Sequence, residues 1–235
     1  MIVSAYLTSG VDLQRGIIQA KDDPQYISAW YDSVIRSELD GVILHDGLSD
    51  SFIRQFPKVK FIRIAECGKF LLYDYRWLAF KSFLENNECD NVFFTDVSDV
   101  RAVKNPFKEP EYDSGKLYCG DVNGDVMRGD YWIGAALKNK KLMALPGFEE
   151  IITSDRLLLN CGTFGGGREI VLKFLNVLCD TILSVADREP DITVDIPVFN
   201  YVMYIYFSSL LYAGWPVNSG FKKYENRNDV WFIHK

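Results

Sequence analysis

Apolar residues in the first half of the chain follow two alternating patterns. Short runs rich in Val, Ile and Phe are typical of buried strands, whereas apolar residues three or four positions apart are typical of helices. The runs predict strands at 2–7, 41–47, 59–64 and 91–95. The helical spacing predicts a helix that begins at Pro24, a short helix at 49–56 and a longer one at 70–85.

The second half of the chain is less regular. Its apolar runs predict four further strands, at 116–120, 156–160, 215–217 and 230–235. Its helical spacing predicts a long helix at 169–185 and another that Asp195 opens. Residues 121–130 are rich in glycine and acidic side chains and predict a loop, and the segment from Tyr131 is expected to fold over the site.

Strands that alternate with helices predict an α/β domain of Rossmann-like type, with a mostly parallel mixed sheet flanked by helices. We expect one domain over 1–235, with a nucleotide-binding half at 1–107 and an acceptor-side half at 108–235. Ligands of such sheets bind beyond the carboxyl ends of the strands. Thr8, Asp46 and Asp96 are expected to emerge there.

Composition narrows the class of protein. The 235 residues are 48% hydrophobic and 25% charged, as in a soluble globular protein, and no apolar run approaches the roughly 20 residues of a membrane span. The first residues lack the basic region of a signal peptide. Five cysteines without a CxxC pair indicate reduced thiols, so we expect a cytoplasmic protein. A net charge of −6 argues against a general polyanion binder.

Two carboxylates follow the strand at 91–95. Asp96 and Asp99 stand three positions apart, and acidic side chains at the end of a buried strand are a common way to hold a hard cation. Asp also favours turns and helix caps, so both residues have a purely structural alternative.

Other polar residues fall at positions where a nucleotide would bind. Thr8, Ser9 and Asp12 follow the first strand and would border the nucleotide, although a surface turn explains them equally well. Arg76, in the helix before Asp96, either contacts a phosphate or extends to the surface as an ordinary amphipathic side chain.

Four glycines lie within residues 162–167, directly after a predicted strand. Glycine lets the backbone approach a ligand closely. Gly165 and Gly166 are therefore expected to pass close to the bound donor.

The order of these features resembles the GT-A fold glycosyltransferases over nearly the whole chain. The resemblance rests on the paired aspartates, then Asn160-x-Gly162-x-Phe164-Gly165-Gly166, then Asp195, then a histidine near the C-terminus. In that family an Asp-x-Asp motif binds a divalent metal that holds the diphosphate of a nucleotide-sugar. Here two residues separate the aspartates instead of one.

The resemblance implies roles for individual residues. Asp96, Asp99 and His234 would hold Mn²⁺ or Mg²⁺, and Lys235 would contact a phosphate. Asn160 and Asp195 would be the catalytic candidates. Blood-group-type transferases carry an Asp-Glu pair where this chain has Asp195-Ile196. Asp195 would therefore accept hydrogen bonds from sugar hydroxyls or act as the base toward the acceptor.

The expected function is metal-dependent transfer from a nucleoside diphosphate sugar, with a UDP-sugar favoured. The acceptor is expected to be a saccharide, a lipid-linked hydroxyl, or hydroxymethylated cytosine in phage DNA, in a bacterial cell or phage-infected host. Binding to DNA would need a basic groove around Arg101, Lys104, Lys108 and 138–141. The alternatives are a sugar nucleotidyltransferase and a non-catalytic nucleotide- or carbohydrate-binding module.

Overall fold

A seven-stranded sheet with the order β10-β8-β9-β6-β1-β4-β5 forms the centre of the molecule. The computed structural model describes residues 1–12, 16–185, 194–220 and 225–235. The strands of the sheet are β1 (Ile2–Tyr6), β4 (Gly41–His45), β5 (Lys60–Arg63), β6 (Asn91–Thr95), β8 (Leu117–Val126), β9 (Leu157–Gly167) and β10 (Leu211–Ala213).

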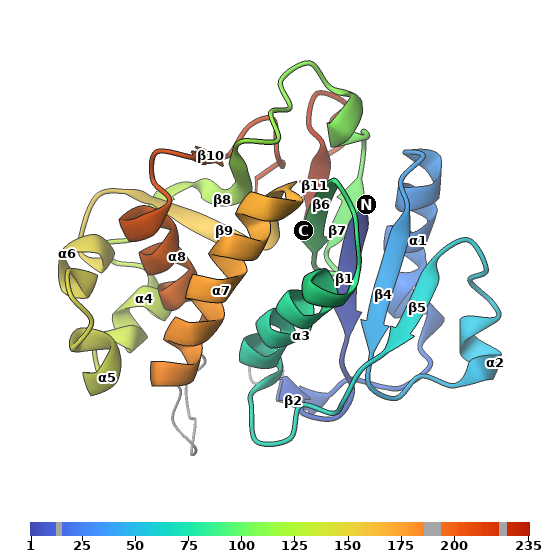
Figure 1. Cartoon of the computed structure of the whole chain (residues 1–235), viewed down its shortest axis with the longest axis horizontal. Helices are drawn as coiled ribbons and strands as arrows, with labels where there is room; N and C mark the ends of the chain where they lie inside the picture. The colour runs from blue at the N-terminus through green and yellow to red at the C-terminus, as the bar shows by residue number, and fades with distance from the viewer. Residues whose placement is uncertain (13–15, 186–193, 221–224) are drawn as a thin grey trace.

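The sheet is mixed but mostly parallel. Strands β5, β4, β1 and β6 run in one direction, and their carboxyl ends meet at the lower edge of the sheet in Figure 1. Strand β9 is antiparallel to both β6 and β8, and β10 is parallel to β8. The α/β fold class predicted from the sequence is confirmed.

Helices cover both faces of the sheet. The longer ones are α1 (Pro24–Arg36), α3 (Leu72–Asn86), α7 (Arg168–Val185) and α8 (Asp195–Tyr206). The short ones are α2 (Asp50–Ile53), η1 (Pro106–Lys108), α4 (Tyr131–Ala136), α5 (Lys140–Met143) and α6 (Phe148–Ile152). Helices α3 and α7 lie side by side on one face (Figure 1), and α8 packs against α7.

No helix among the residues that the structure describes is long and apolar enough to cross a membrane.

Alternate residues of each central strand point into two different hydrophobic cores. Val92 and Phe94 of β6 pack with α3, α7 and α8, whereas Phe93 between them packs with α1 and the C-terminal Trp231. Both faces are therefore buried, which explains the continuous apolar runs in the sequence.

Two small antiparallel pairs complete the fold. Strands β2 (Val11–Asp12) and β3 (Ile17–Ile18) form a pair near the carboxyl edge of the sheet. Strands β7 (Val100–Ala102) and β11 (Phe232–His234) form the other, with His234 opposite Val100. The second pair carries the end of the chain back to the segment that follows β6.

Some predicted boundaries in the second half are wrong. The loop expected at 121–130 is partly strand, because β8 continues to Val126 beside β9. The strand expected at 215–217 is a turn, and the nearby strand is β10. Strand β9 continues through the glycines to Gly167 instead of ending before them.

The glycines of β9 serve close packing between strands. A Cβ on Gly165 would lie 2.3 Å from the carbonyl oxygen of Val92, and one on Gly166 would lie 2.3 Å from that of Lys116. Both glycines therefore fill places where the backbones of β6 and β8 leave no room for a side chain.

We expect Gly165→Ala to lower the free energy of unfolding by at least about 2 kcal/mol, since the methyl group meets backbone that cannot move aside. Urea unfolding measures the effect. Gly134→Ala is the matched control, because a Cβ there meets nothing within 4 Å and the residue lies in α4. The control should leave stability unchanged or raise it by up to about 1 kcal/mol; equal losses in both variants would contradict the packing role.

Candidate active site

Polar residues follow β1, β4 and β6 at the carboxyl edge of the sheet. Asp46, after β4, holds the turn after β1. Its Oδ1 accepts hydrogen bonds from the backbone N–H of Thr8 at 2.8 Å and from the Thr8 hydroxyl at 2.9 Å. Its Oδ2 accepts from the Ser9 N–H at 3.0 Å and from the Ser9 hydroxyl at 2.6 Å. The Asp46 carboxylate therefore fixes the turn that follows β1.

Asp12 lies on the same side of the molecule. It is buried in β2, and the Tyr73 hydroxyl at the start of α3 donates a hydrogen bond to its Oδ1. The three residues predicted to border a nucleotide, Thr8, Ser9 and Asp12, thus lie near one another at this edge. The contacts made by Asp46 and Tyr73 are between residues far apart in the sequence and were not predicted.

Arg76 of α3 is the centre of the site. Its Nη1 lies 2.7 Å from Asp96 Oδ1, and its Nη2 lies 2.9 Å from Asp195 Oδ2. Nη2 also donates to the Cys161 thiol at 3.0 Å. The guanidinium packs over the Trp77 ring, 4.7 Å from its centroid. The Arg76 side chain thus connects the end of β6 and the start of α8 to the middle of β9. Arg76 is buried, so the alternative that it is a surface residue is wrong.

The charge of Arg76 is secured by these neighbours. Burial alone would lower its pKa, but the neighbouring groups, with the Asp96 and Asp195 carboxylates among them, more than offset that effect, and the pKa is raised. Burial raises the pKa of the Cys161 thiol, although Arg76 opposes the shift. The thiol is therefore neutral beside a permanent cation.

The Asn160–Gly162 segment of β9 faces the end of β6. The carbonyl oxygen of Gly162 accepts from the Asp96 N–H at 2.9 Å, and Asn160 Oδ1 accepts from the Gly162 N–H at 2.7 Å. A Cβ on Gly162 would lie 2.5 Å from His234 Cε1 and 2.6 Å from Asp96 Oδ2. The missing side chain of Gly162 therefore leaves the space in which the imidazole and this carboxylate oxygen meet.

The C-terminal residues reach the site through β11. The backbone N–H of Lys235 donates to the Asp99 carbonyl at 2.9 Å, and Lys235 Nζ lies 3.8 Å from Asp99 Oδ1. His234 is buried, and its N–H donates to the Ser219 hydroxyl at 3.2 Å. Burial lowers the pKa of His234, while Asp96 and Asp99 partly oppose the shift. The imidazole is therefore neutral at neutral pH, which is the form that binds a metal ion.

The three predicted metal ligands suit a divalent ion in kind. Asp96 and Asp99 supply carboxylate oxygens and His234 a neutral imidazole, a combination that Mn²⁺ accepts. Within the ranges 1–12, 16–185, 194–220 and 225–235, however, no three or more His, Cys, Asp or Glu side chains are arranged to hold an ion. One oxygen of Asp96 is also engaged by Arg76. The predicted ligands therefore suit a divalent ion by their chemistry, but the described residues show no preformed metal geometry.

Gly165 and Gly166 do not lie with these residues. They pair with Phe93 and Val92 near the start of β6, whereas Asp96 follows the end of that strand. Both are buried between β6 and β8, so the structure gives no support to the expectation that they approach the donor.

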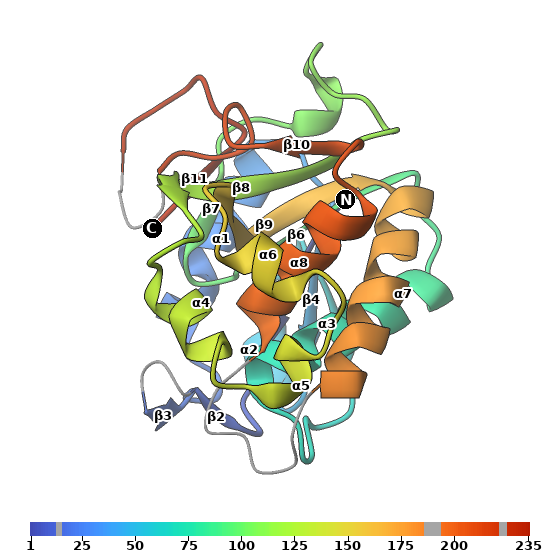
Figure 2. The same cartoon turned by 90° about the vertical axis from the view of Figure 1, so that its left-hand side faces the viewer.

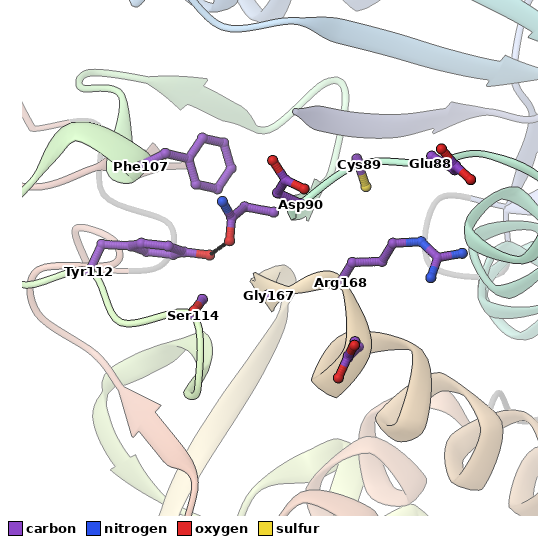
Figure 3. Close-up of a pocket in the computed structure, with 10 residues that line it drawn as sticks. Glu88, Cys89, Asp90, Phe107, Tyr112, Ser114, Gly167 and Arg168 are labelled. Carbon is purple, nitrogen blue, oxygen red and sulfur yellow. Dashed lines mark hydrogen bonds between the residues drawn. The ribbon is translucent and has the colours of Figure 1, made fainter.

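A pocket of about 760 Å³ lies at the other end of β6. Tyr112 and Arg168, which are labelled in Figure 3, line it. Asn91 lines it as well, and the Tyr112 hydroxyl donates to Asn91 Oδ1 at 2.7 Å. The Arg168 guanidinium donates to the Leu84 carbonyl at 2.6 Å. None of the predicted catalytic or metal-binding residues lines this pocket, so it is separate from the candidate active site.

The basic residues considered for DNA do not form one groove. Lys104 pairs with Glu109 at 2.8 Å, and Lys108 pairs with Glu38 at 2.7 Å. Figures 1 and 2 show α5, which contains Lys140 and Lys141, at the lower end of the molecule and η1 at the upper end.

Comparisons with known proteins find similarity in fold but not in sequence family. No family model and no curated protein matches the chain. Among the solved structures that match, two cover 99% of this chain and 86% of their own length, each with a TM-score of 0.55. One is an active-site mutant of LgtC, with 13% sequence identity, and the other is the galactosyltransferase LgtC in complex with donor and acceptor sugar analogs, with 14%. The chain therefore shares the GT-A fold of LgtC, as the sequence predicted.

We expect Arg76→Met to lower the free energy of unfolding by about 3 kcal/mol, because the substitution leaves the buried Asp195 carboxylate without its cation. Chemical denaturation measures the loss. Lys81→Met is the control on the same helix, since the exposed Lys81–Glu85 pair should contribute under about 1 kcal/mol.

A second substitution separates charge from packing. Asp195→Asn in the Arg76→Met background should restore part of the stability, because it removes the negative charge that Arg76 no longer balances. Equal and additive losses from the two substitutions would contradict a direct interaction.

Proposed function

We propose that the chain transfers a glycosyl group from a nucleoside diphosphate sugar to an acceptor hydroxyl with the help of a divalent metal ion. A UDP-sugar is the favoured donor. The main support is the convergence of Arg76, Asp96, Asp195 and His234 at the carboxyl edge of a GT-A fold, where nucleotides bind in open α/β sheets. The solved LgtC structure of the same fold contains donor and acceptor sugar analogs.

The reaction breaks the bond between the anomeric carbon and a diphosphate oxygen. An acceptor oxygen bonds to that carbon, and its proton passes to water. Negative charge then grows on the leaving diphosphate, and fixed cations lower the cost of that charge. Arg76 supplies a permanent charge inside the site, and Lys235 supplies an exposed ammonium at its margin.

Asp96, Asp99 and His234 are proposed to hold Mn²⁺ or Mg²⁺. A bound ion of this type acts as a Lewis acid toward phosphate oxygens. Asp96 has a second role, because its Oδ1 pairs with Arg76 while its Oδ2 borders the same space beside Gly162 as the His234 ring. Asp99 is held near the end of the chain by its contacts with Lys235.

The contacts of Asp195 favour one of its two proposed roles. Its Oδ2 is engaged by Arg76, and its Oδ1 accepts the N–H of Ile196 at 2.8 Å. A carboxylate held at both oxygens suits hydrogen bonding and orientation better than removal of a proton. Asn160 is proposed to face the transferred sugar, with its Oδ1 anchored by the Gly162 N–H.

Thr8, Ser9 and Asp12 are proposed to border the nucleotide at the same edge of the sheet. The acceptor is proposed to be a saccharide or a lipid-linked hydroxyl. Hydroxymethylated cytosine in DNA has less support, because the basic residues that would bind the duplex lie at different ends of the molecule.

Incubation with a panel of nucleotide-sugars and Mn²⁺ should release a nucleoside diphosphate from at least one donor. Asp96→Asn should reduce this rate by about a hundredfold, because it removes the carboxylate charge that is proposed to bind the ion and that pairs with Arg76. Chromatography of the nucleotide products measures the reaction. Asp90→Asn, an exposed residue at the other end of β6, is the control and should keep the parent rate.

The products also distinguish the alternatives. Release of pyrophosphate from a nucleoside triphosphate and a sugar phosphate would indicate a nucleotidyltransferase. Binding of donor without any product over long incubation with Mn²⁺ would indicate a non-catalytic module.

A further inference from the structure

Helices α4 and α5 present an exposed surface that is both apolar and basic. Tyr131 and Leu137 are 77% and 42% exposed, and the neighbouring Lys138, Lys140 and Lys141 are exposed as well. These five residues are called the α4–α5 patch below. Large apolar side chains and lysines mixed in one short segment need an explanation in a chain whose net charge is −6.

The α4–α5 patch is held on a fixed support. Asp130 caps α4 by accepting the N–H groups of Trp132 and Ile133 at 2.9 and 3.1 Å. Ile133 and Leu142, on the opposite sides of the two helices, are buried in the main core. The helices are therefore anchored by their inner faces, and the outward direction of the patch is set by packing.

A second apolar surface lies at the same end of the molecule. The β2–β3 pair exposes Val11, Ile17 and Ile18 by 46%, 50% and 62%. Figures 1 and 2 both show this pair and α5 at the lower end, which is also the end with the carboxyl edge of the sheet. The two exposed apolar surfaces thus lie at the same end of the molecule as the carboxyl edge of the sheet.

We propose that the α4–α5 patch, together with the β2–β3 pair, docks the protein on an anionic lipid surface. Interfacial segments combine apolar and aromatic side chains, which enter the headgroup region, with lysines that attract anionic headgroups. Each lysine near such a surface contributes measurably to binding. A DNA duplex would engage the lysines but would leave Leu137, Ile17 and Ile18 without a role.

Docking in this orientation turns the candidate active site toward the headgroups. A lipid-linked hydroxyl would then reach the site from the membrane, and this last point rests on the proposed function. The docking itself does not, because vesicle binding needs neither donor nor turnover.

Sedimentation with vesicles tests the docking. The full chain should bind vesicles of phosphatidylcholine with phosphatidylglycerol at low salt, and binding should weaken as salt rises. Binding to phosphatidylcholine alone should be much weaker. The triple variant Lys138→Gln, Lys140→Gln, Lys141→Gln should lose about a hundredfold in apparent affinity. Tyr131→Ser with Leu137→Ser should also weaken binding.

Matched controls lie away from the patch. Lys58, Lys60 and Lys108 are exposed, and their combined change to Gln removes the same charge from another part of the molecule. Tyr212→Ser removes a 37% exposed ring from β10. Both controls should bind vesicles as the parent does. The proposal is overturned if the parent fails to bind anionic vesicles, if patch and control variants bind alike, or if duplex DNA is bound more tightly than the vesicles.

Discussion

The guanidinium of Arg76 lies inside the molecule, where an uncompensated charge would cost several kcal/mol. It is retained because Asp96, Cys161 and Asp195 converge on it from three separate elements. Helix α3 supplies the cation, β6 and α8 supply the carboxylates, and β9 supplies the thiol. The packing of these elements and the chemistry of the site therefore depend on the same contacts.

The topology of the sheet explains how such distant residues meet. Strand β9 enters antiparallel between β6 and β8, so that Gly162 lies beside Asp96. Strand β11 pairs with β7 and returns the chain end to Asp99. Glycine is required twice along β9 for different reasons. At Gly165 it admits neighbouring backbone, and at Gly162 it leaves room for His234 and Asp96.

The sequence predicted the parts that depend on local pattern. Strands β1, β4 and β6, helices α3 and α7, and the polar positions after the strands follow from periodicity and from the rule that ligands bind at carboxyl ends. The order of Asp96, Asp99, Asp195 and His234 also indicated one site. The features that were not predicted depend on contacts between residues distant in the sequence.

The glycines at 165 and 166 show this limit most clearly. A glycine run permits close approach of any kind, and only the pairing partner decides whether a ligand or a strand approaches. The contacts of Asp46 and Cys161 were not predicted for the same reason, since their hydrogen bonds join residues 34 or more positions apart. The length of β8 depended likewise on pairing with β9.

Calorimetry of UDP binding tests most directly whether this cluster is a diphosphate site that uses a metal ion. With Mn²⁺ present, the parent chain is expected to bind UDP, and chelation of the ion should weaken that binding at least about tenfold. Asp99→Asn should show the weak binding even with Mn²⁺ present. Equal affinity with and without Mn²⁺, or no binding of UDP under either condition, would contradict the account.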